Sequence, residues 1–134
     1  MSDYNEVVRK AVPLHDTLGI RVIKVSTELV VMELDWSEDL CTTAGVLHGG
    51  ILMALADSAA TACSFFNLPK GAAGTITIEF KNNFLGAVTE GTVVATAKPL
   101  HTGSSTLVME TELHVGDRLV AKSMQTQAVL DTHH

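Results

Sequence analysis

The sequence predicts an α+β fold in which one long central helix is wrapped by a mostly antiparallel sheet of about six strands. Two observations lead to this prediction. The most apolar stretch covers residues 48–66, and Leu52, Leu55 and Ala59 repeat within it at the three- and four-residue spacing of a helix face. The remaining apolar segments alternate with polar residues and are joined mostly by short turns, which is typical of antiparallel strands.

The part of the chain before the long helix is expected to contain a short N-terminal helix that Pro13 stops, a strand, a turn, a second strand and a polar loop. These segments are residues 4–12, 19–25, 26–28, 29–36 and 37–47.

After the long helix, residues 67–71 include Pro69 and Gly71, which end the helix. Four further strands are expected, the last two joined by a two-residue turn at Gly116-Asp117. These strands are residues 74–84, 91–98, 104–115 and 118–130.

Length and composition indicate a single globular domain over residues 1–134, with its core at about 12–130. The chain is 46% hydrophobic and 18% charged, and its net charge of −6 without a cluster of Lys or Arg argues against binding to nucleic acid. The N-terminus has no apolar signal-peptide core, and the longest apolar run is short for a membrane span. We therefore expect a cytoplasmic protein that does not associate with membranes.

One helix cannot cover a six-stranded sheet and also remove its edges. An exposed edge strand tends to pair with another chain, so we expect two copies to join edge to edge as a homodimer at minimum.

Asp57 is the only charged side chain between His48 and Lys70. A carboxylate in so apolar a helix is costly unless it has a function. Nine residues earlier, His48-Gly49-Gly50 opens the helix, and the free backbone N–H groups of a helix N-terminus can bind an anion. An oxyanion site and a lone carboxylate indicate hydrolytic chemistry, although Asp57 could instead belong to a solvated polar stripe.

The run Gly45-Val46-Leu47-His48-Gly49-Gly50, followed by Asp57 and Thr61, resembles the hotdog-fold acyl-CoA thioesterases of the phenylacetate-pathway and 4-hydroxybenzoyl-CoA type. The resemblance extends over roughly residues 12–130. It implies an acyl-CoA substrate, no cofactor because CoA is part of the substrate, and a homotetramer formed as a dimer of dimers.

The resemblance also implies a role for each matching residue. Gly49 corresponds to the glycine whose N–H polarises the thioester carbonyl, and Asp57 to the general base or nucleophile, which reaches the site from the partner subunit. His48, beside the thioester, corresponds to a positioning residue, and Gly50 is expected to contact substrate. Thr61 and Thr75 correspond to hydroxyl groups that contact substrate or orient water.

An independent argument also brings Asp57 from a second subunit, because nine residues of helix span about 13 Å. In one chain Asp57 is therefore too far from the start of its own helix.

Two positions depart from the family pattern. Thr42, a predicted substrate-binding residue, stands where an Asn or Gln is usual, and a hydroxyl has a shorter reach than an amide. Gly103-Ser104-Ser105 lacks the basic residue found near the CoA phosphates in relatives. Positive charge must come from elsewhere: Lys81 is a predicted substrate-binding residue, and Lys98, Arg118 and Lys122 are the other candidates.

The sequence leaves two other functions open: a hotdog-fold enoyl-CoA hydratase or dehydratase, and a non-catalytic acyl-CoA-binding protein. His48 could instead simply cap the helix. No metal site is predicted, because His15, His101 and His114 share no ligand-like spacing. The sequence does not define the acyl group.

Overall fold

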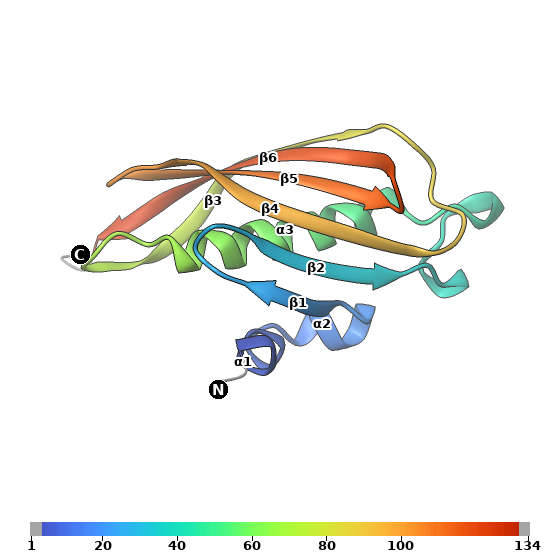
Figure 1. Ribbon diagram of the computed structural model, residues 1–134, viewed down its shortest axis with the longest axis horizontal. Helices are drawn as coiled ribbons and strands as arrows, with labels where there is room; N and C mark the ends of the chain where they lie inside the picture. The colour runs from blue at the N-terminus through green and yellow to red at the C-terminus, as the bar shows by residue number, and fades with distance from the viewer. Residues whose placement is uncertain (1–3, 132–134) are drawn as a thin grey trace.

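The computed structural model describes residues 4–131, so the first three and last three residues of the predicted domain lie outside the described part. Its sheet confirms the predicted α+β fold (Figure 1). Six strands pair antiparallel throughout, in the order β1-β2-β4-β5-β6-β3. Their bounds are Arg21–Val25 (β1), Val30–Asp35 (β2), Ala72–Phe84 (β3), Thr92–Thr102 (β4), Thr106–Val115 (β5) and Arg118–Asp131 (β6).

The long helix α3 (Gly49–Phe66) lies along one face of this sheet (Figure 1). Its buried side chains are small or aliphatic, among them Leu55, Ala59 and Cys63, each fully buried. They meet the inward-facing residues of the central strands, such as Leu34 of β2 and Met109 of β5. Small residues allow the curved sheet to approach the helix closely.

The helix packs mainly under β2, β4 and β5 and touches β3 and β6 less. Among the described residues α3 alone has the length and apolarity of a membrane span. Its position under the sheet is that of a core helix.

Two helices precede the sheet where one was predicted. The first, α1 (Tyr4–Ala11), is followed by α2 (Pro13–Leu18). Pro13 ends α1 as expected, but it also occupies the first position of α2, where proline is favoured because its missing N–H would be unpaired there anyway. Gly19, with φ of 77°, ends α2 in the left-handed conformation.

Two further differences concern the loop and β4. The loop before α3 contains two short 3-10 helices, Glu38–Leu40 and Thr43–Gly45. Strand β4 continues three residues beyond Pro99, where the prediction ended it at residue 98. The pairing of β4 with β5 shifts register between Pro99 and His101, and such a bulge tolerates the missing proline N–H.

Strand β3 forms one edge of the sheet and pairs only with β6. It is 13 residues long and its side chains are mostly exposed, including Ile76 (55%) and Ile78 (61%). A long edge strand with exposed apolar side chains is the kind of surface that pairs with another chain.

Candidate functional site

The first turn of α3 leaves one backbone donor available. His48 has extended backbone angles, and its Nδ1 accepts a hydrogen bond from the Gly50 N–H at 2.8 Å. Its carbonyl oxygen accepts from the N–H groups of Ile51 and Leu52. No acceptor is assigned to the Gly49 N–H among residues 4–131, as is usual for the first residue of a helix. Gly49 therefore retains the free donor that an oxyanion site requires, whereas the Gly50 N–H is engaged.

A cavity of about 390 Å³ opens beside this donor. Thr42 and Gly49 lie on its wall, together with Leu52 of α3 and Phe84 at the end of β3. A Cβ atom on residue 49 would lie 3.2 Å from the Phe84 ring, so glycine allows a close approach here. We name this hollow the Gly49 cavity; it is completed by Val46, Leu47, Gly86, Ala87 and Val88.

Asp57 lies two turns further along α3 and is half-buried. One of its oxygens, Oδ1, accepts hydrogen bonds from the Gln125 side-chain amide at 2.5 Å and from the Thr61 hydroxyl at 3.3 Å. Thr61 is one helical turn after Asp57, as the sequence indicated. Its hydrogen bond to Asp57 holds the two side chains together on one face of α3.

Gln125 is itself held by a second glutamine on β6. Gln127 donates from Nε2 to Oε1 of Gln125 and to the Thr77 hydroxyl, both at 2.6 Å. Gln125 and Gln127 are 0% and 1% exposed. An ionised carboxylate only accepts hydrogen bonds, so the side-chain NH₂ group of Gln125 must point toward Asp57. The side-chain oxygen of Gln125 then accepts a hydrogen bond from Gln127. The chain of amides fixes the carboxylate from the sheet side.

Sequence reasoning missed both glutamines, although a signal was present. The inward-facing positions of β6 alternate along Ala121, Ser123, Gln125 and Gln127, all of them buried. Long amides at positions that should be apolar indicate a buried polar partner.

A second cavity, of about 290 Å³, opens at Asp57. Asp57, Ser58, Thr61 and neighbouring residues of α3 form one side, and α1 and α2 form the other. We name it the Asp57 cavity; the rest of its wall is Val7, Val8, Ala11, Val12, His15, Ala62, Phe65 and Phe66. It shares no residue with the Gly49 cavity, so Asp57 and Gly49 of one chain open into different hollows.

Other predicted residues lie outside both cavities. Thr75 is on β3, paired with Val129. Lys81 is exposed on β3 and borders a small hollow with Lys122, whose ammonium group is 3.0 Å from Glu110. Glu110 and Glu112 raise the pKa of Lys122, and their negative charges offset its positive charge.

Arg118 is closer to the site. Its guanidinium packs over Gly86, where an added Cβ would come within 2.8 Å of Nη1, and Gly86 lines the Gly49 cavity.

The fold is that of the hotdog thioesterases, and comparison with known proteins assigns the family. The chain belongs to the thioesterase superfamily, whose family model matches residues 44–122. It is 33% identical over 120 residues to ComA2 of Bacillus subtilis, provisionally named an esterase, a match that covers 87% of this chain and 94% of ComA2. It is also 33% identical over 107 residues to the 1,4-dihydroxy-2-naphthoyl-CoA hydrolase of Listeria monocytogenes, covering 75% of this chain and 80% of that enzyme.

Solved structures agree. A thioesterase family protein from Silicibacter pomeroyi superposes with a TM-score of 0.84 at 28% identity, over 96% of this chain and 99% of that one. A thioesterase from Haemophilus influenzae, at 22% identity, has a TM-score of 0.88 over 100% and 97% of the two chains and shows the same fold.

Proposed function

We propose that the protein hydrolyses an acyl-CoA thioester to the free acid and CoA, with Asp57 as general base or nucleophile. The observation that carries this proposal is the geometry of Asp57. It is a carboxylate in an apolar helix, held on one side by Gln125 and Thr61 and open on the other to a cavity. A carboxylate that is both oriented and accessible can activate water, and general-base catalysis typically contributes about 10²–10⁴-fold.

The Gly49 N–H is the proposed oxyanion donor. Attack on a thioester develops negative charge on the carbonyl oxygen, and a preorganised donor at a helix N-terminus stabilises that charge. The side chain of His48 supports this role by capping the helix at Gly50, which leaves the neighbouring N–H of Gly49 free for substrate. Water is the only co-substrate, and the proposed reaction uses no cofactor.

The active site is proposed to be shared between two subunits. Asp57 and Gly49 of one chain border separate cavities, so a second chain must bring a carboxylate to each oxyanion donor. Strand β3 offers the surface for this assembly, because it is a sheet edge with exposed Ile76 and Ile78. We propose a homodimer joined through β3, assembled further into a tetramer, in the cytoplasm and away from membranes.

Arg118 is the best candidate for binding the CoA phosphates. It adjoins the Gly49 cavity at Gly86, and a guanidinium suits phosphate oxygens well. The sequence indicates Lys81 as substrate-binding and leaves Lys98, Arg118 and Lys122 as alternatives. Lys81 lies outside the Gly49 cavity, and Lys122 is already near Glu110 and Glu112.

A thiol-release assay over a panel of acyl-CoA esters tests the function, with Asp57→Asn as the diagnostic variant. We expect turnover by the wild type and loss of at least about 10²-fold in Asp57→Asn at unchanged thermal stability. Absence of turnover with every ester, or wild-type rates in Asp57→Asn, would exclude this mechanism.

The alternative of a hydratase or dehydratase requires a free histidine opposite the carboxylate. His48 is engaged in capping α3, which disfavours this reading. Incubation with an enoyl-CoA, followed by the loss of its conjugated absorbance, discriminates the two reactions. A non-catalytic binder would have no need for the buried amides that orient Asp57, and would bind CoA esters tightly without turnover.

A further inference from the structure

A chain of hydrogen bonds connects Asp57 with the edge strand β3. Gln125 donates to Asp57 at 2.5 Å and accepts from Gln127 at 2.6 Å. Gln127 also donates to the Thr77 hydroxyl of β3 at 2.6 Å. Both glutamines are buried, whereas Thr77 is exposed. The chain of bonds therefore begins at the surface of an edge strand and ends at the proposed catalytic carboxylate.

The ionised carboxylate determines the direction of every bond in this chain. Because Asp57 only accepts, Gln125 presents its NH₂ group to Asp57 and its oxygen to Gln127. The NH₂ group of Gln127 has two hydrogens, of which one goes to Gln125 and the other to Thr77. The Thr77 oxygen therefore accepts, and its hydroxyl proton remains to be donated. No acceptor for that proton is assigned among residues 4–131.

Thr77 faces the same side of the sheet as α3, but it is not covered by this helix. It lies directly opposite Gln127 in the pairing of β3 with β6, and residues paired in this way point to the same face. Helix α3 packs mainly under β2, β4 and β5. The register of β3 shifts between Thr77 and Glu79, and a bulge of this kind redirects side chains and is common next to active sites.

The unused donor thus lies on the strand through which two chains are proposed to join. Its neighbours Ile76 and Ile78 are exposed apolar side chains of the same edge. In a two-fold symmetric dimer, Thr77 of each chain would face the same surface of the other.

We propose that Thr77 donates a hydrogen bond to the second copy of the chain, and that Gln127 and Gln125 transmit this contact to Asp57. This inference rests on the proposed thioesterase function. It adds that assembly through β3 orients the carboxylate as well as bringing it to the partner's oxyanion donor. Thr77 and Gln127 are positioning residues, which act on the reaction through Asp57. Buried hydrogen bonds in a chain strengthen one another, so a change at Thr77 reaches Asp57.

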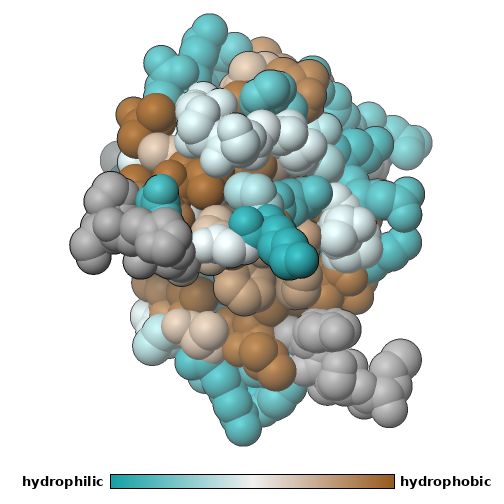
Figure 2. All heavy atoms as spheres, turned by 90° about the vertical axis from the view of Figure 1, so that its left-hand side faces the viewer, coloured by the Kyte–Doolittle hydropathy of each residue, from teal (hydrophilic) through white to brown (hydrophobic). Residues whose placement is uncertain are grey.

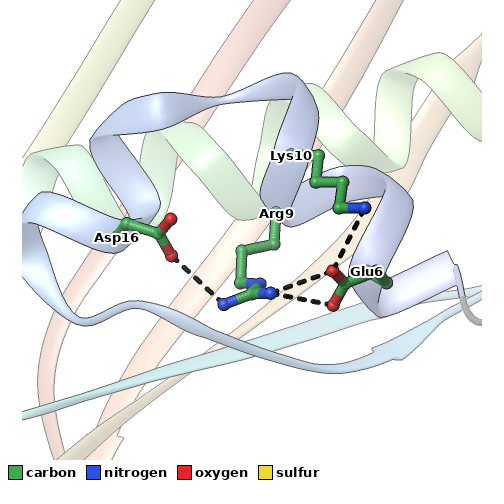
Figure 3. Close-up of polar contacts among 4 residues, drawn as sticks. All are labelled: Glu6, Arg9, Lys10 and Asp16. Atoms are coloured by element: carbon green, nitrogen blue, oxygen red, sulfur yellow. Dashed lines mark hydrogen bonds and ion pairs between the residues drawn. The ribbon is translucent and has the colours of Figure 1, made fainter.

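The opposite side of the Asp57 cavity is held by weaker contacts. There Arg9 joins α1 to α2, with Glu6 at 2.9 Å and Asp16 at 3.4 Å (Figure 3). These ion pairs are exposed, and exposed pairs contribute little to stability. The orientation of Asp57 therefore depends mainly on the sheet side, where the bonds are short and the amides are buried.

Thr77→Val tests the outer end of the chain, because valine keeps the shape of threonine and removes the hydroxyl. We expect kcat to fall about tenfold with little change in KM, and the dimer Kd from sedimentation to rise about fivefold or more. Thr77→Ser keeps the hydroxyl and should restore both values. The matched control is Thr126→Val, which lies on β6 between the two glutamines and points to the other face of the sheet. It should resemble the wild type, and thermal unfolding checks that each variant is folded.

A double-mutant cycle separates transmission from a general loss of stability. If Thr77 acts through the amides, Thr77→Val should have no further effect on kcat once Gln125→Leu is present. Losses that multiply would overturn the proposed connection.

A spectroscopic readout does not depend on hydrolysis. The NMR signal of the Gln125 side-chain NH₂ group, two bonds along the chain from Thr77, should move in Thr77→Val. It should stay in place in Thr126→Val and in Arg9→Ala, which alters only the opposite wall.

The inference is wrong if Thr77→Val leaves the dimer Kd or the Gln125 signal unchanged, or if it keeps wild-type kcat in an active enzyme. If no ester is turned over by the wild type, but Thr77→Val still changes the dimer Kd and the Gln125 signal, then the thioesterase proposal fails and the connection between β3 and Asp57 is retained.

Discussion

Replacing Gly49 with proline would remove the proposed oxyanion donor at the backbone. Residue 49 is the first residue of α3, a position where proline is favoured and where the lost N–H makes no bond to any residue between 4 and 131. The residue before a proline must be extended, and His48 already has φ of −60° and ψ of 134°. The helix should therefore form normally in Gly49→Pro.

The matched control is Gly49→Ala, which keeps the N–H. Alanine and proline both place a Cβ atom 3.2 Å from the Phe84 ring, so packing strain affects both variants. The difference between them isolates the donor, and loss of one oxyanion donor costs about 10²–10³-fold in kcat, or about 3–4 kcal/mol.

Steady-state hydrolysis of the best acyl-CoA substrate, with thermal unfolding alongside, measures this difference. We expect kcat of Gly49→Pro to lie at least about 10²-fold below that of Gly49→Ala at similar melting temperatures. Equal rates in the two variants would refute the assignment of Gly49.

Three further predictions concern the supports of the site. Gln125→Leu removes an amide that donates to Asp57. In steady-state kinetics kcat should fall about 10–100-fold with little change in KM. An unchanged kcat would show that Gln125 does not support catalysis. Ile78→Lys puts a charge on the exposed strand β3 and should shift the oligomer toward monomer in sedimentation velocity, with activity falling in parallel; an unchanged oligomer would place the interface elsewhere. Because the pKa of His15 is lowered in the folded protein, this ring is protonated in the unfolded chain before it is protonated in the folded one as the pH falls through 6.5. The free energy of unfolding should therefore decrease below that pH by up to about 1.4 kcal/mol per pH unit. Chemical denaturation between pH 7.5 and 5 should show a smaller loss in His15→Leu, and equal slopes would contradict the burial of a neutral ring.

The central helix and the strands could be predicted because their patterns are local. The spacing of Leu52, Leu55 and Ala59 defines a helix face, and the alternation in residues 74–84 and 118–130 defines strands. The strand order could not be predicted in the same way. Strand β3 follows α3 in the sequence but pairs with β6 at the far edge of the sheet, and that pairing depends on contacts between residues about 50 positions apart.

Part of the candidate site could also be predicted, because it depends on local patterns in one segment of the chain. Asp57 and Gly49 stood out as a charge in an apolar helix and a glycine at its start, both readable from one segment. Gln125 was missed because its importance comes from facing Asp57 across the fold. His15 drew attention only as a poor metal ligand, since its burial without partners exists only once α1 and α2 are packed.

The end of the molecule at which α3 finishes carries exposed apolar side chains. Viewed from the end where α3 finishes, apolar residues form patches between polar ones (Figure 2). Phe65, in the last turn of α3, is 65% exposed and also lines the Asp57 cavity. A large aromatic side chain that is exposed in one chain beside a ligand cavity is consistent with a site that a second subunit completes.

The shared active site is the central claim, and mixing two inactive variants tests it most directly. Asp57→Asn and Gly49→Pro are each expected to be inactive, and equal amounts are unfolded together, refolded and assayed. If the site joins Asp57 of one subunit to Gly49 of the other, each mixed dimer has one intact site. Because about half of the dimers are mixed, the sample should recover about a quarter of wild-type activity per subunit. If each chain has its own complete site, every site carries one defect, and the mixture will remain as inactive as its components.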